Sequence, residues 1–409
     1  MRGRPLLHTS YQSDSAMLNT TSKRVGAAVL LALVVLLPFG RVPGLGLFGD
    51  AGWQLVLVQV LIFAIAALGL NVLTGLAGQV SLGHAFFMGV GAYAGLVLGA
   101  EPRPGLWGLG LPIWIWVPGA GVVAALLGIL VSPAAVRLRG LYLAIVTLGL
   151  VFVGEHLFRN LEFIAGTPGL GRSWPDLELK LWKEEEPLLD LAVGGDELGV
   201  RLTGLQKQFV FILLLLLVFM LITKNIARTR TGRALQAIRD RDIAAEIMGV
   251  PEAKYKLIAF AISSFYAGVG GALLGSVIGS LNPEFWSLVL SVQLIAIILI
   301  GGIGTVSGTL LGSVFVVASA RLIEEATGLL ETTAQGDGLF AGLADLIVVR
   351  GQDFGLISLQ PTGPGLALFH FNQVFYGLLV VLFLIFEPLG LYGIWIKVRN
   401  YWKGWPFSY

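Results

Sequence analysis

Long apolar stretches alternate with shorter polar segments along most of this chain. A helix needs about 20 mostly apolar residues to cross a bilayer, and slightly shorter stretches can suffice. Ten stretches meet this requirement, at residues 25–46, 52–74, 78–99, 111–134, 140–158, 208–223, 257–281, 288–304, 306–322 and 373–394. The pattern therefore predicts an all-α polytopic membrane protein, in which residues 25–394 form one domain of ten spans.

The composition supports this fold class. The chain has 409 residues, 56% of them hydrophobic and only 13% charged, and its mean hydropathy is +0.83. Soluble domains carry about 25% charged residues, so this chain is expected in a lipid bilayer. It has no cysteine, which excludes disulfides, thiolate metal sites and a cysteine nucleophile. No cleavage site of small residues follows the first apolar stretch, which indicates an uncleaved first span.

The distribution of basic residues predicts the orientation. Residues 224–256 carry eight basic and four acidic side chains, and loops rich in Lys and Arg stay in the cytoplasm. Alternating outward from this loop places the two insertions, residues 159–207 and 324–372, on the outer side. Both chain ends then lie in the cytoplasm. The cytoplasmic side also receives the polar segment 1–24, Arg137, Arg139 and the basic tail 395–409, which holds Lys397, Arg399 and Lys403.

The two insertions differ from the apolar spans. The first insertion alternates polar and apolar residues and contains turn signals, which predicts a small external cap. The second contains TTAQGDG and LQPTGPG, which are typical of loops.

Glycine recurs at spacings of four within several predicted spans. Small residues let helix backbones approach closely in lipid, so such stripes predict tight helix–helix contacts. The stripes are Gly91, Gly95 and Gly99; Gly271, Gly275 and Gly279; and Gly304, Gly308 and Gly312. A second interpretation is that some of these glycines let helices shift or break beside a pathway.

A polar trio interrupts the third predicted span, GLAGQVSLGHAFFMGVGAYAG. Polar groups at membrane depth usually face the bundle interior or a water-filled cavity. Ser81 and His84 are three residues apart and are predicted to share a helix face. With Gln79, and with Gln293 in the eighth span, they are the candidate lining of a translocation pathway. The alternative is that Gln79 and Ser81 cap a helix start or bond to a neighbouring helix.

The cytoplasmic loop RTRTGRALQAIRDRDIAAEIMGVPEAKYKL contains signals for short helices. Leu235 and Ile238 fall on one face, Asp242 is a predicted N-cap, and Gly249 followed by Pro251 ends the second helix. A short helix with a small or apolar face suits docking into a groove on a partner protein. The alternative is a helix that lies on anionic lipid, helped by the basic residues.

Four stretches make the chain similar to a known family of transport proteins. They are NVLTGLAGQVSLGHAFFMGVGAYAG, RLRGLYLAIVTLGLVF, GRALQAIRDRDIAAEIMGVPEAKYKLIAFAISSFYAGVGGALLG and LIAIILIGGIGTVSGTLLGS, and the segment FEPLGLYGIW fits too. The chain resembles the permease subunits of ABC importers for branched-chain amino acids, in particular the subunit that pairs with a second, related permease. The resemblance implies a ten-helix permease bundle in the plasma (inner) membrane, served by two ABC ATPases and an external substrate-binding protein.

The resemblance also implies that the loop at residues 224–256 couples the permease to ATP hydrolysis. Its apolar and small positions Leu235, Ile238, Ala244 and Ala245 are expected to enter a groove on the ATPase. The full set of expected coupling residues is Gly232, Arg233, Leu235, Ile238, Arg239, Asp240, Ala244, Ala245, Glu246 and Gly249. The sequence has no G-x-x-x-x-G-K-[ST] motif, so we expect partner subunits to hydrolyse ATP and this chain to bind no cofactor.

The expected function is transport and not catalysis. By resemblance the substrates are leucine, isoleucine and valine, although related permeases carry urea or short amides and the motifs do not separate these classes. The chain is expected to contact lipid and no nucleic acid. An intramembrane serine hydrolase is a remote alternative, with Ser307 as nucleophile and His84 or His156 as base. A stand-alone channel or secondary transporter is a further alternative, but the spans hold few charged residues for a relay.

Overall fold

The computed structural model describes residues 21–40, 46–138, 140–165, 174–175, 177–180, 189–197, 200–334, 348–349, 357–358, 366–387 and 389–404. The chain divides into two compact units, Met1–Leu55 and Val56–Tyr409. In the first unit, α2 (Thr21–Leu36) is followed by two short 3-10 helices, η1 (Leu37–Phe39) and η2 (Gly46–Gly49). The Gln54 side chain donates hydrogen bonds to the Pro38 and Gly49 carbonyls, at 3.0 and 2.9 Å, and so ties these turns together.

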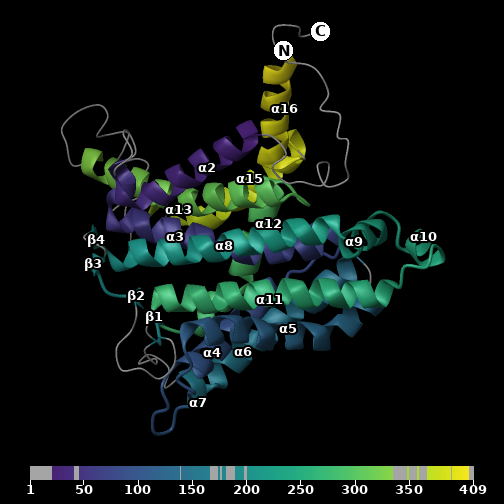
Figure 1. Cartoon of the computed structure of the whole chain (residues 1–409), viewed down its shortest axis with the longest axis horizontal. Helices are drawn as coiled ribbons and strands as arrows, with labels where there is room; N and C mark the ends of the chain where they lie inside the picture. The colour runs from purple at the N-terminus through teal and green to yellow at the C-terminus, as the bar shows by residue number, and fades with distance from the viewer. Residues whose placement is uncertain are drawn as a thin grey trace. The chain divides into compact units, whose positions relative to one another are not determined.

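The second unit is a bundle of helices (Figure 1). α3 (Ala51–Leu70) enters it and continues into a π-helix, η3 (Asn71–Leu76). The other helices in chain order are α4 (His84–Gly99), α5 (Ile113–Arg137), α6 (Leu141–Asn160), α7 (Glu162–Ala165), α8 (Gly204–Arg228), α9 (Arg230–Asp240), α10 (Asp242–Ile247), α11 (Glu252–Ile278), η4 (Pro283–Trp286), α12 (Leu288–Gly301), α13 (Val306–Ala334), α15 (Leu368–Phe386) and α16 (Gly390–Gly404). This confirms the all-α fold class.

Each of the ten predicted spans overlaps an apolar helix. Among the described residues, six helices are long and apolar enough to cross a membrane, and α15 with α16 forms a bent pair that passes the same test together. Three shorter apolar helices, Arg24–Phe39, His84–Gly99 and Leu288–Gly301, coincide with the remaining predicted spans. The membrane-spanning character of these shorter helices, and hence the count of ten, stays a prediction.

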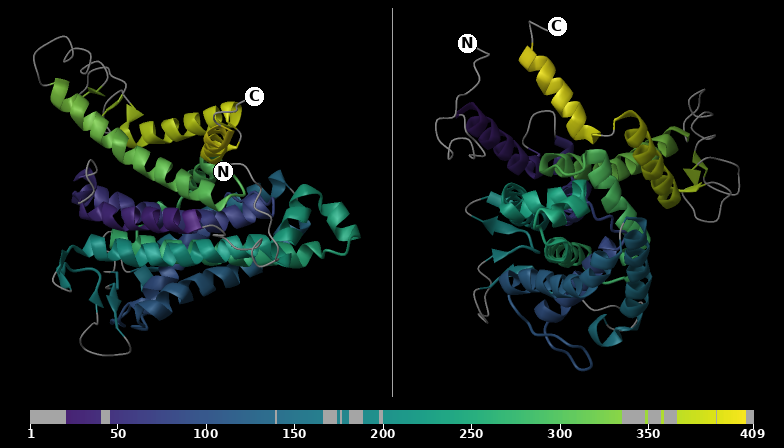
Figure 2. Two further views of the ribbon diagram at one scale, coloured as in Figure 1. Left: turned by 45° about the horizontal axis from the view of Figure 1, so that its top comes forward. Right: turned by 90° about the vertical axis from the view of Figure 1, so that its right-hand side faces the viewer.

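α11 is the central helix of the second unit, because α3, α4 and α5 all pack against it (Figure 2). The closest approach is between α4 and α11. A Cβ atom at Gly271 would lie 1.9 Å from the Met88 carbonyl oxygen, and one at Gly91 would lie 2.1 Å from the Gly268 carbonyl oxygen. Backbone atoms cannot move aside as a flexible side chain can, so these glycines allow the two helices to touch.

The predicted glycine stripes are confirmed at most of their positions. Gly95 packs against Ala272, and Gly312 approaches the Ile297 carbonyl between α12 and α13. Gly279 and Gly304 are exceptions. Both have positive φ, 77° and 79°, and they lie where a helix ends or a turn forms and not on a packed helix face.

The first insertion contains short strands, and its external position stays a prediction. Its described residues form two antiparallel pairs of short strands, β1 (Glu178–Leu179) with β2 (Leu189–Asp190), and β3 (Gly195–Glu197) with β4 (Val200–Leu202). Its Trp174 side chain packs on Gly275 of α11. Thr203 and Gln206 then form a capping box, which explains why α8 begins at Gly204 and not near residue 208 as predicted.

The second insertion begins later than predicted. α13 continues to Ala334, so residues 324–334 are helical and not loop. The other described residues before α15 form three short parallel strands, β5 (Val348–Val349), β6 (Ile357–Ser358) and β7 (Leu366–Ala367), and β7 leads directly into α15.

The C-terminal boundary was also predicted wrongly. The expected tenth span, 373–394, is interrupted after Phe386, and α16 runs from Gly390 to Gly404 through most of the expected tail. The two helices are bent by 41° relative to each other. The break contains Pro388, which lacks the N–H that a continuous helix requires.

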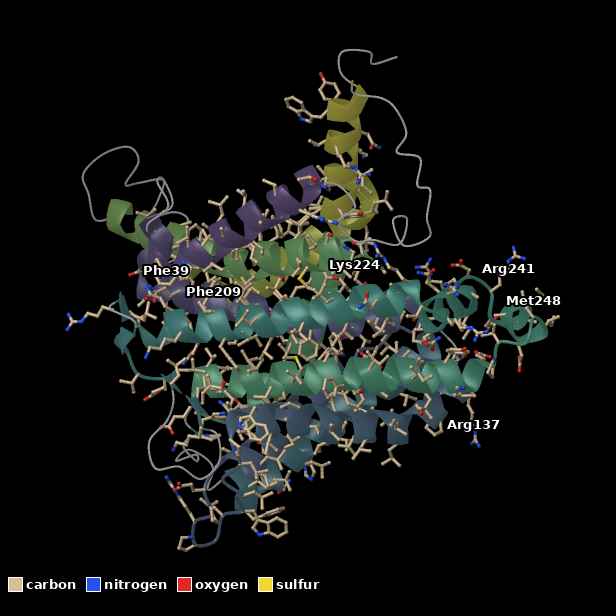
Figure 3. The ribbon with its side chains drawn as sticks, in the orientation of Figure 1. Phe39, Arg137, Phe209, Lys224, Arg241 and Met248 are labelled. Atoms are coloured by element: carbon tan, nitrogen blue, oxygen red, sulfur yellow. The ribbon has the colours of Figure 1, made fainter. Side chains whose placement is uncertain are left out.

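The loop predicted to be cytoplasmic and the first insertion lie at opposite ends of α8 in the second unit. α8 has 25 residues, about 37 Å of helix, with the strands of the first insertion before it and α9 after it. Arg137, Arg241 and Met248 lie at the α9 end, while Phe209 lies near the other (Figure 3). Arg139 falls outside the described residues.

Candidate functional site

The third predicted span does not start as a helix. α3 passes into the π-helix η3, a wide turn that is frequent at functional positions, and residues 77–83 are irregular before α4 begins at His84. The prediction of one helix over residues 78–99 is therefore wrong at its start. Irregular backbone at membrane depth is tolerated where protein buries it or where it lines a cavity. We call residues 77–83 the helix break.

Side chains from distant helices satisfy the backbone of the helix break and of the first turn of α4. The Thr147 hydroxyl on α6 accepts a hydrogen bond from the Leu82 N–H, at 3.0 Å. The Ser291 hydroxyl on α12 accepts one from the Ala85 N–H, also at 3.0 Å. Thr147 and Ser291 are fully buried, so they replace water as partners for this backbone.

The candidate pathway residues do not share one helix face as predicted. Ser81 precedes the N-cap residue Gly83, and its hydroxyl accepts from the Gly83 N–H at 3.3 Å. His84 is fully buried, and its Nε2 donates to the Ala66 carbonyl at 3.0 Å. These two side chains therefore hold the break in shape. The expectation that Ser81 bonds near a helix start fits better than the expectation of a shared lining face.

The other two pathway candidates are less buried. Gln79 is half-buried in the helix break, and its side-chain amide donates to the Ala77 carbonyl at 3.3 Å. Gln293 is half-buried on α12, two residues beyond Ser291 and so on another side of that helix. Ser81 and His84 both bond at or next to the helix break, while Gln293 lies on α12.

A second turn meets the helix break from the far part of the chain. α12 ends at Gly301, and the turn at residues 302–305 leads into α13. The buried Asn71 side chain of η3 accepts from the Gly304 N–H at 2.7 Å and donates to the Thr305 carbonyl at 3.2 Å. Because Asn71 bonds to the turn in both directions, η3 and the α12–α13 turn are held as one junction.

The loop at residues 224–256 reaches this junction through one charged side chain. Arg239 of α9 donates from Nη1 to the Gly75 carbonyl of η3 at 2.7 Å, a charge-assisted hydrogen bond. The aliphatic part of Arg239 also lies against Gly78, where φ is 69°. Arg239 therefore links the loop to the start of the helix break and to the α12–α13 turn beside it.

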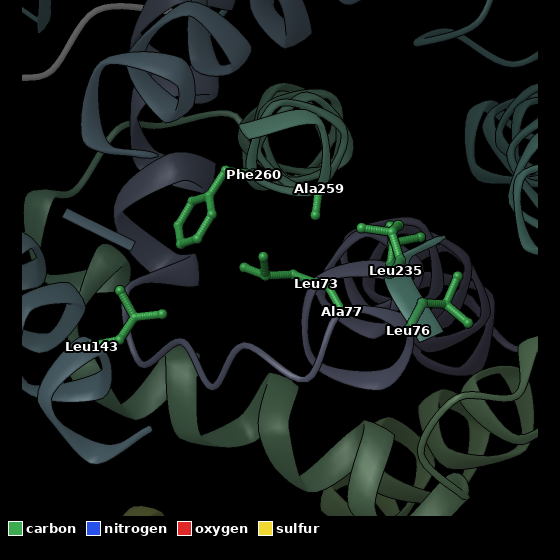
Figure 4. Close-up of a cluster of buried hydrophobic side chains, with 8 residues drawn as sticks. Leu73, Leu76, Ala77, Leu143, Leu235, Ala259 and Phe260 are labelled. Carbon is green, nitrogen blue, oxygen red and sulfur yellow. The ribbon is translucent and has the colours of Figure 1, made fainter. Parts of the chain in front are cut away.

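Apolar packing also holds α9 to the junction. Leu235 is fully buried in a cluster with Val72, Leu73, Leu76, Ala77, Leu143, Ala259 and Phe260 (Figure 4). Gly232 allows α9 to fold back on α8, because a Cβ there would lie 2.3 Å from the Ile226 carbonyl oxygen. Leu235 and Ile238 do share a buried face, as predicted.

Most of the loop positions that were predicted to face a partner protein are buried within this chain. Leu235, Ile238 and Ala245 have exposed fractions of 0%, 3% and 5%, so they are covered by this chain and cannot enter a groove on another protein. Of the four predicted positions, Ala244 alone is exposed. Amphipathic spacing placed the apolar residues on one face correctly, but the chain's own η3 and α11 cover that face.

A different apolar surface is exposed at the tip of the loop. Ile243, Ile247 and Met248 on and just after α10 have exposed fractions of 60%, 80% and 83%. Ile243 and Ile247 are four residues apart and so lie on one side of the helix. We call Ile243, Ala244, Ile247 and Met248 the tip surface. α10 lies beyond the end of α11, away from the body of the bundle (Figure 1).

The remaining predicted loop residues shape or flank α9 and α10. Arg233 donates to the Arg228 carbonyl, and Arg239 also pairs with Asp240 at 3.2 Å. Asp242 accepts from the Ile243 N–H and begins α10, with Arg241 as the N-cap residue, one position earlier than predicted. Glu246 is exposed, and Gly249 has a φ of 84° where the second helix ends, as predicted.

The structure does not bring Ser307 and His84 together, as the alternative of a serine hydrolase requires. Ser307 is exposed at the start of α13, beside the turn that contacts η3 near Gly75. His84 bonds Ala66, nine residues before Gly75 and therefore about 13 Å away along the helix. A nucleophile and its base must be within hydrogen-bond reach, and these two are not.

Sequence reasoning missed Asn71, Thr147 and Ser291. Each is a polar residue with apolar neighbours on both sides inside a predicted span, and each is at most 2% exposed. Such isolated polar positions are the signal that could have found them, since a polar group in lipid needs a partner. Their partners lie far away along the chain, so the sequence alone does not pair them.

The chain matches a known protein family over most of its length. The family described as branched-chain amino acid transport system / permease component matches residues 54–385, which is most of the chain. The chain belongs to this family. The matched region contains the helix break, the α12–α13 turn and the cytoplasmic loop, so the junction lies within the shared part.

Individual relatives agree with the family. The LivM permease of the high-affinity branched-chain amino acid transport system of Escherichia coli K12 is 31% identical over 320 residues, 75% of this chain and 70% of LivM. The related permease LivH of the same organism is 23% identical, over 61% of this chain and 78% of LivH. An autoinducer 2 import permease, LsrD of Yersinia enterocolitica, is 22% identical, over 82% of this chain and 94% of LsrD. A comparison with solved structures finds no match.

The chain is therefore a multi-pass permease component of an importer, and its family is one of transport proteins and not of enzymes.

Proposed function

We propose that this chain forms part of the translocation pathway for leucine, isoleucine and valine in an ATP-driven importer, together with a second related permease. The greater identity to LivM, 31%, than to the autoinducer permease, 22%, supports branched-chain amino acids as substrates, and nothing among these relatives favours urea or short amides. An external binding protein would deliver the substrate. Two partner ATPases would hydrolyse ATP, since the sequence has no phosphate-binding G-x-x-x-x-G-K-[ST] motif.

The observation that carries this proposal is the link from the tip surface to the helix break. The tip surface is apolar, exposed and beyond the end of the bundle, which favours a protein partner over a lipid surface. α9 carries movement of that surface to η3 and to the α12–α13 turn, through Arg239 and Leu235. A break that is held by a few hydrogen bonds can change shape at a lower free-energy cost than a continuous helix.

Uptake measurements test the substrate. We expect vesicles that contain the assembled importer and its binding protein to accumulate leucine, isoleucine or valine when ATP is supplied inside. The same vesicles supplied with a non-hydrolysable ATP analogue provide the control. Accumulation of urea without these amino acids would disprove the substrate assignment and leave the permease assignment intact.

The orientation of the chain is part of the same proposal, with both termini and the loop in the cytoplasm. The chain has no native cysteine, so single cysteines can be placed cleanly. Val193 in the first insertion and Lys254 at the start of α11 are exposed positions at opposite ends of α8. Glu185 and Asp337 would also test the two insertions predicted to be external, but both lie outside the described residues.

We expect Val193→Cys to react with an impermeant thiol reagent in intact cells, and Lys254→Cys to react only after the cells are permeabilised. The permeabilised sample controls for cover by a partner protein. Reaction of Lys254→Cys in intact cells would show that the chain has the opposite orientation in the membrane.

A further inference from the structure

α16 carries an exposed apolar face that the transport function does not use. Its apolar residues recur at helical spacing and cover about a third of the helix circumference. Trp395, Tyr401 and Trp402 are 56%, 62% and 70% exposed, and Ile394 and Val398 are also exposed. Two basic residues flank this face: Lys397 lies on one side of it and Arg399 on the other.

Contacts place the start of α16 beside the α12–α13 turn, at the end of the bundle that carries α9. Gly390 packs so closely on the end of α12 that a Cβ there would lie 2.5 Å from the Ile300 carbonyl oxygen. Tyr392 contacts Gly302 in the α12–α13 turn, and Gly304 of the same turn is bonded to Asn71. α16 therefore begins beside the junction that Arg239 joins to the cytoplasmic loop.

The direction of α16 differs from that of the spans. It runs across α8 and α11 and not along them, as Figure 1 and the right-hand view of Figure 2 both show. An ion pair between Lys397 and Glu387, at 2.6 Å, joins α16 to the end of α15 and so helps to fix this bend. If α8 and α11 cross the membrane, α16 runs along its surface.

The chemistry of the exposed face matches a membrane interface. Trp and Tyr have an apolar ring and a polar tip, and they gather at the level of lipid headgroups. Lys and Arg beside such a face can direct their charge toward anionic headgroups while their stems cover apolar surface. The tip surface of α10 differs, because it lies beyond the ends of the spans and holds no aromatic residue.

We propose that α16 is an interfacial helix, embedded in the headgroup region of the cytoplasmic leaflet with its aromatic face toward the acyl chains. Because its first turn contacts Gly302, α16 holds the α12–α13 turn at a fixed depth in the membrane. α9 can then move relative to a turn that lipid anchors. This inference rests on the position of the chain in the membrane and not on its substrate or its ATPases.

Spin labels on single cysteines test the proposal in the full-length permease, reconstituted in vesicles of phosphatidylethanolamine and phosphatidylglycerol. Val398→Cys places the label on the aromatic face, and Asn400→Cys places it on the opposite face. Met248→Cys on the tip surface supplies an aqueous reference. Each labelled variant should first elute from size exclusion as the parent does. Collision rates are then measured with oxygen, which concentrates among acyl chains, and with a nickel chelate, which stays in water.

We expect the ratio of oxygen to nickel collisions to be severalfold higher at Val398 than at Asn400, with Asn400 close to the Met248 reference. Equal ratios, with nickel reaching Val398 freely, would show a solvated tail and overturn the proposal. A Val398 label that is immobilised and shielded from both reagents would also overturn it, because a protein partner and not lipid would then cover the face.

Discussion

Replacing Gly271 by leucine should leave little folded protein. The Cβ atom of any other residue at this position would lie 1.9 Å from the backbone oxygen of Met88, so α4 and α11 would have to separate. Overpacking in a well-packed interior typically costs about 1–3 kcal/mol and occasionally more. The cost should be at the upper end here, because the obstacle is backbone and because α11 also contacts α3 and α5.

The measurement is the yield of monodisperse permease in detergent and its melting temperature. Gly149→Leu is the matched control, since Gly149 is an exposed glycine within α6 and a Cβ there would meet nothing within 4 Å. We expect the control to match the parent in both quantities. Equal yield and melting temperature for Gly271→Leu and Gly149→Leu would refute the close α4–α11 contact.

Hydropathy was sufficient to locate the helices but not their ends. Each predicted span overlaps an apolar helix, because a lipid-embedded backbone must satisfy its own hydrogen bonds and helices do so locally. The ends depend on finer chemistry. The capping box of Thr203 and Gln206 moves the start of α8 outward, and the last predicted span is interrupted between Phe386 and Gly390.

The helix break could not be predicted from its own residues. GQVSLG is apolar enough to continue a span, and hydropathy does not distinguish a helix from an irregular segment that protein buries. What permits the break is a pair of partners from distant helices, Thr147 on α6 and Ser291 on α12. These partners come together only after the helices have packed, so their pairing is tertiary information.

The loop at residues 224–256 shows a second limit of prediction from the sequence. Periodicity correctly put Leu235 and Ile238 on one face, but it could not say which protein covers that face. In the structure η3 and α11 cover it, and the exposed apolar residues are Ile243, Ile247 and Met248. A charge at Ala245 would therefore disrupt this chain's own packing, and loss of ATPase binding by Ala245→Glu would not identify the docking surface.

Ile247→Asp is expected to separate the permease from its ATPases while the permease itself stays folded. Ile247 is 80% exposed, so an aspartate there is solvated in the free permease. In a complex it would be desolvated against an apolar groove, which costs a few kcal/mol. Since about 1.4 kcal/mol is a tenfold change in affinity, ATPase association should fall at least tenfold.

The test is co-purification of the ATPase with the permease, alongside leucine uptake in the same cells. Ala253→Asp is the matched control, because it adds the same charge at an exposed position in the first turn of α11, where a helix N-terminus favours it. We expect this control to bind the ATPase and to transport like the parent. If Ile247→Asp also binds and transports normally, the tip surface is not the docking site, and a loop that lies on lipid becomes the better interpretation.

A companion variant distinguishes docking from transmission in the same experiment. Arg239→Ala removes the hydrogen bond to the Gly75 carbonyl but leaves the tip surface intact, so it should retain the ATPase and lose most of the uptake. Arg233→Ala is its control, because Arg233 bonds the Arg228 carbonyl within the loop and does not reach η3. Ile247→Asp should thus lose both binding and uptake, and Arg239→Ala uptake alone. Normal uptake by Arg239→Ala would mean that Leu235 packing is enough to connect the loop to the helix break.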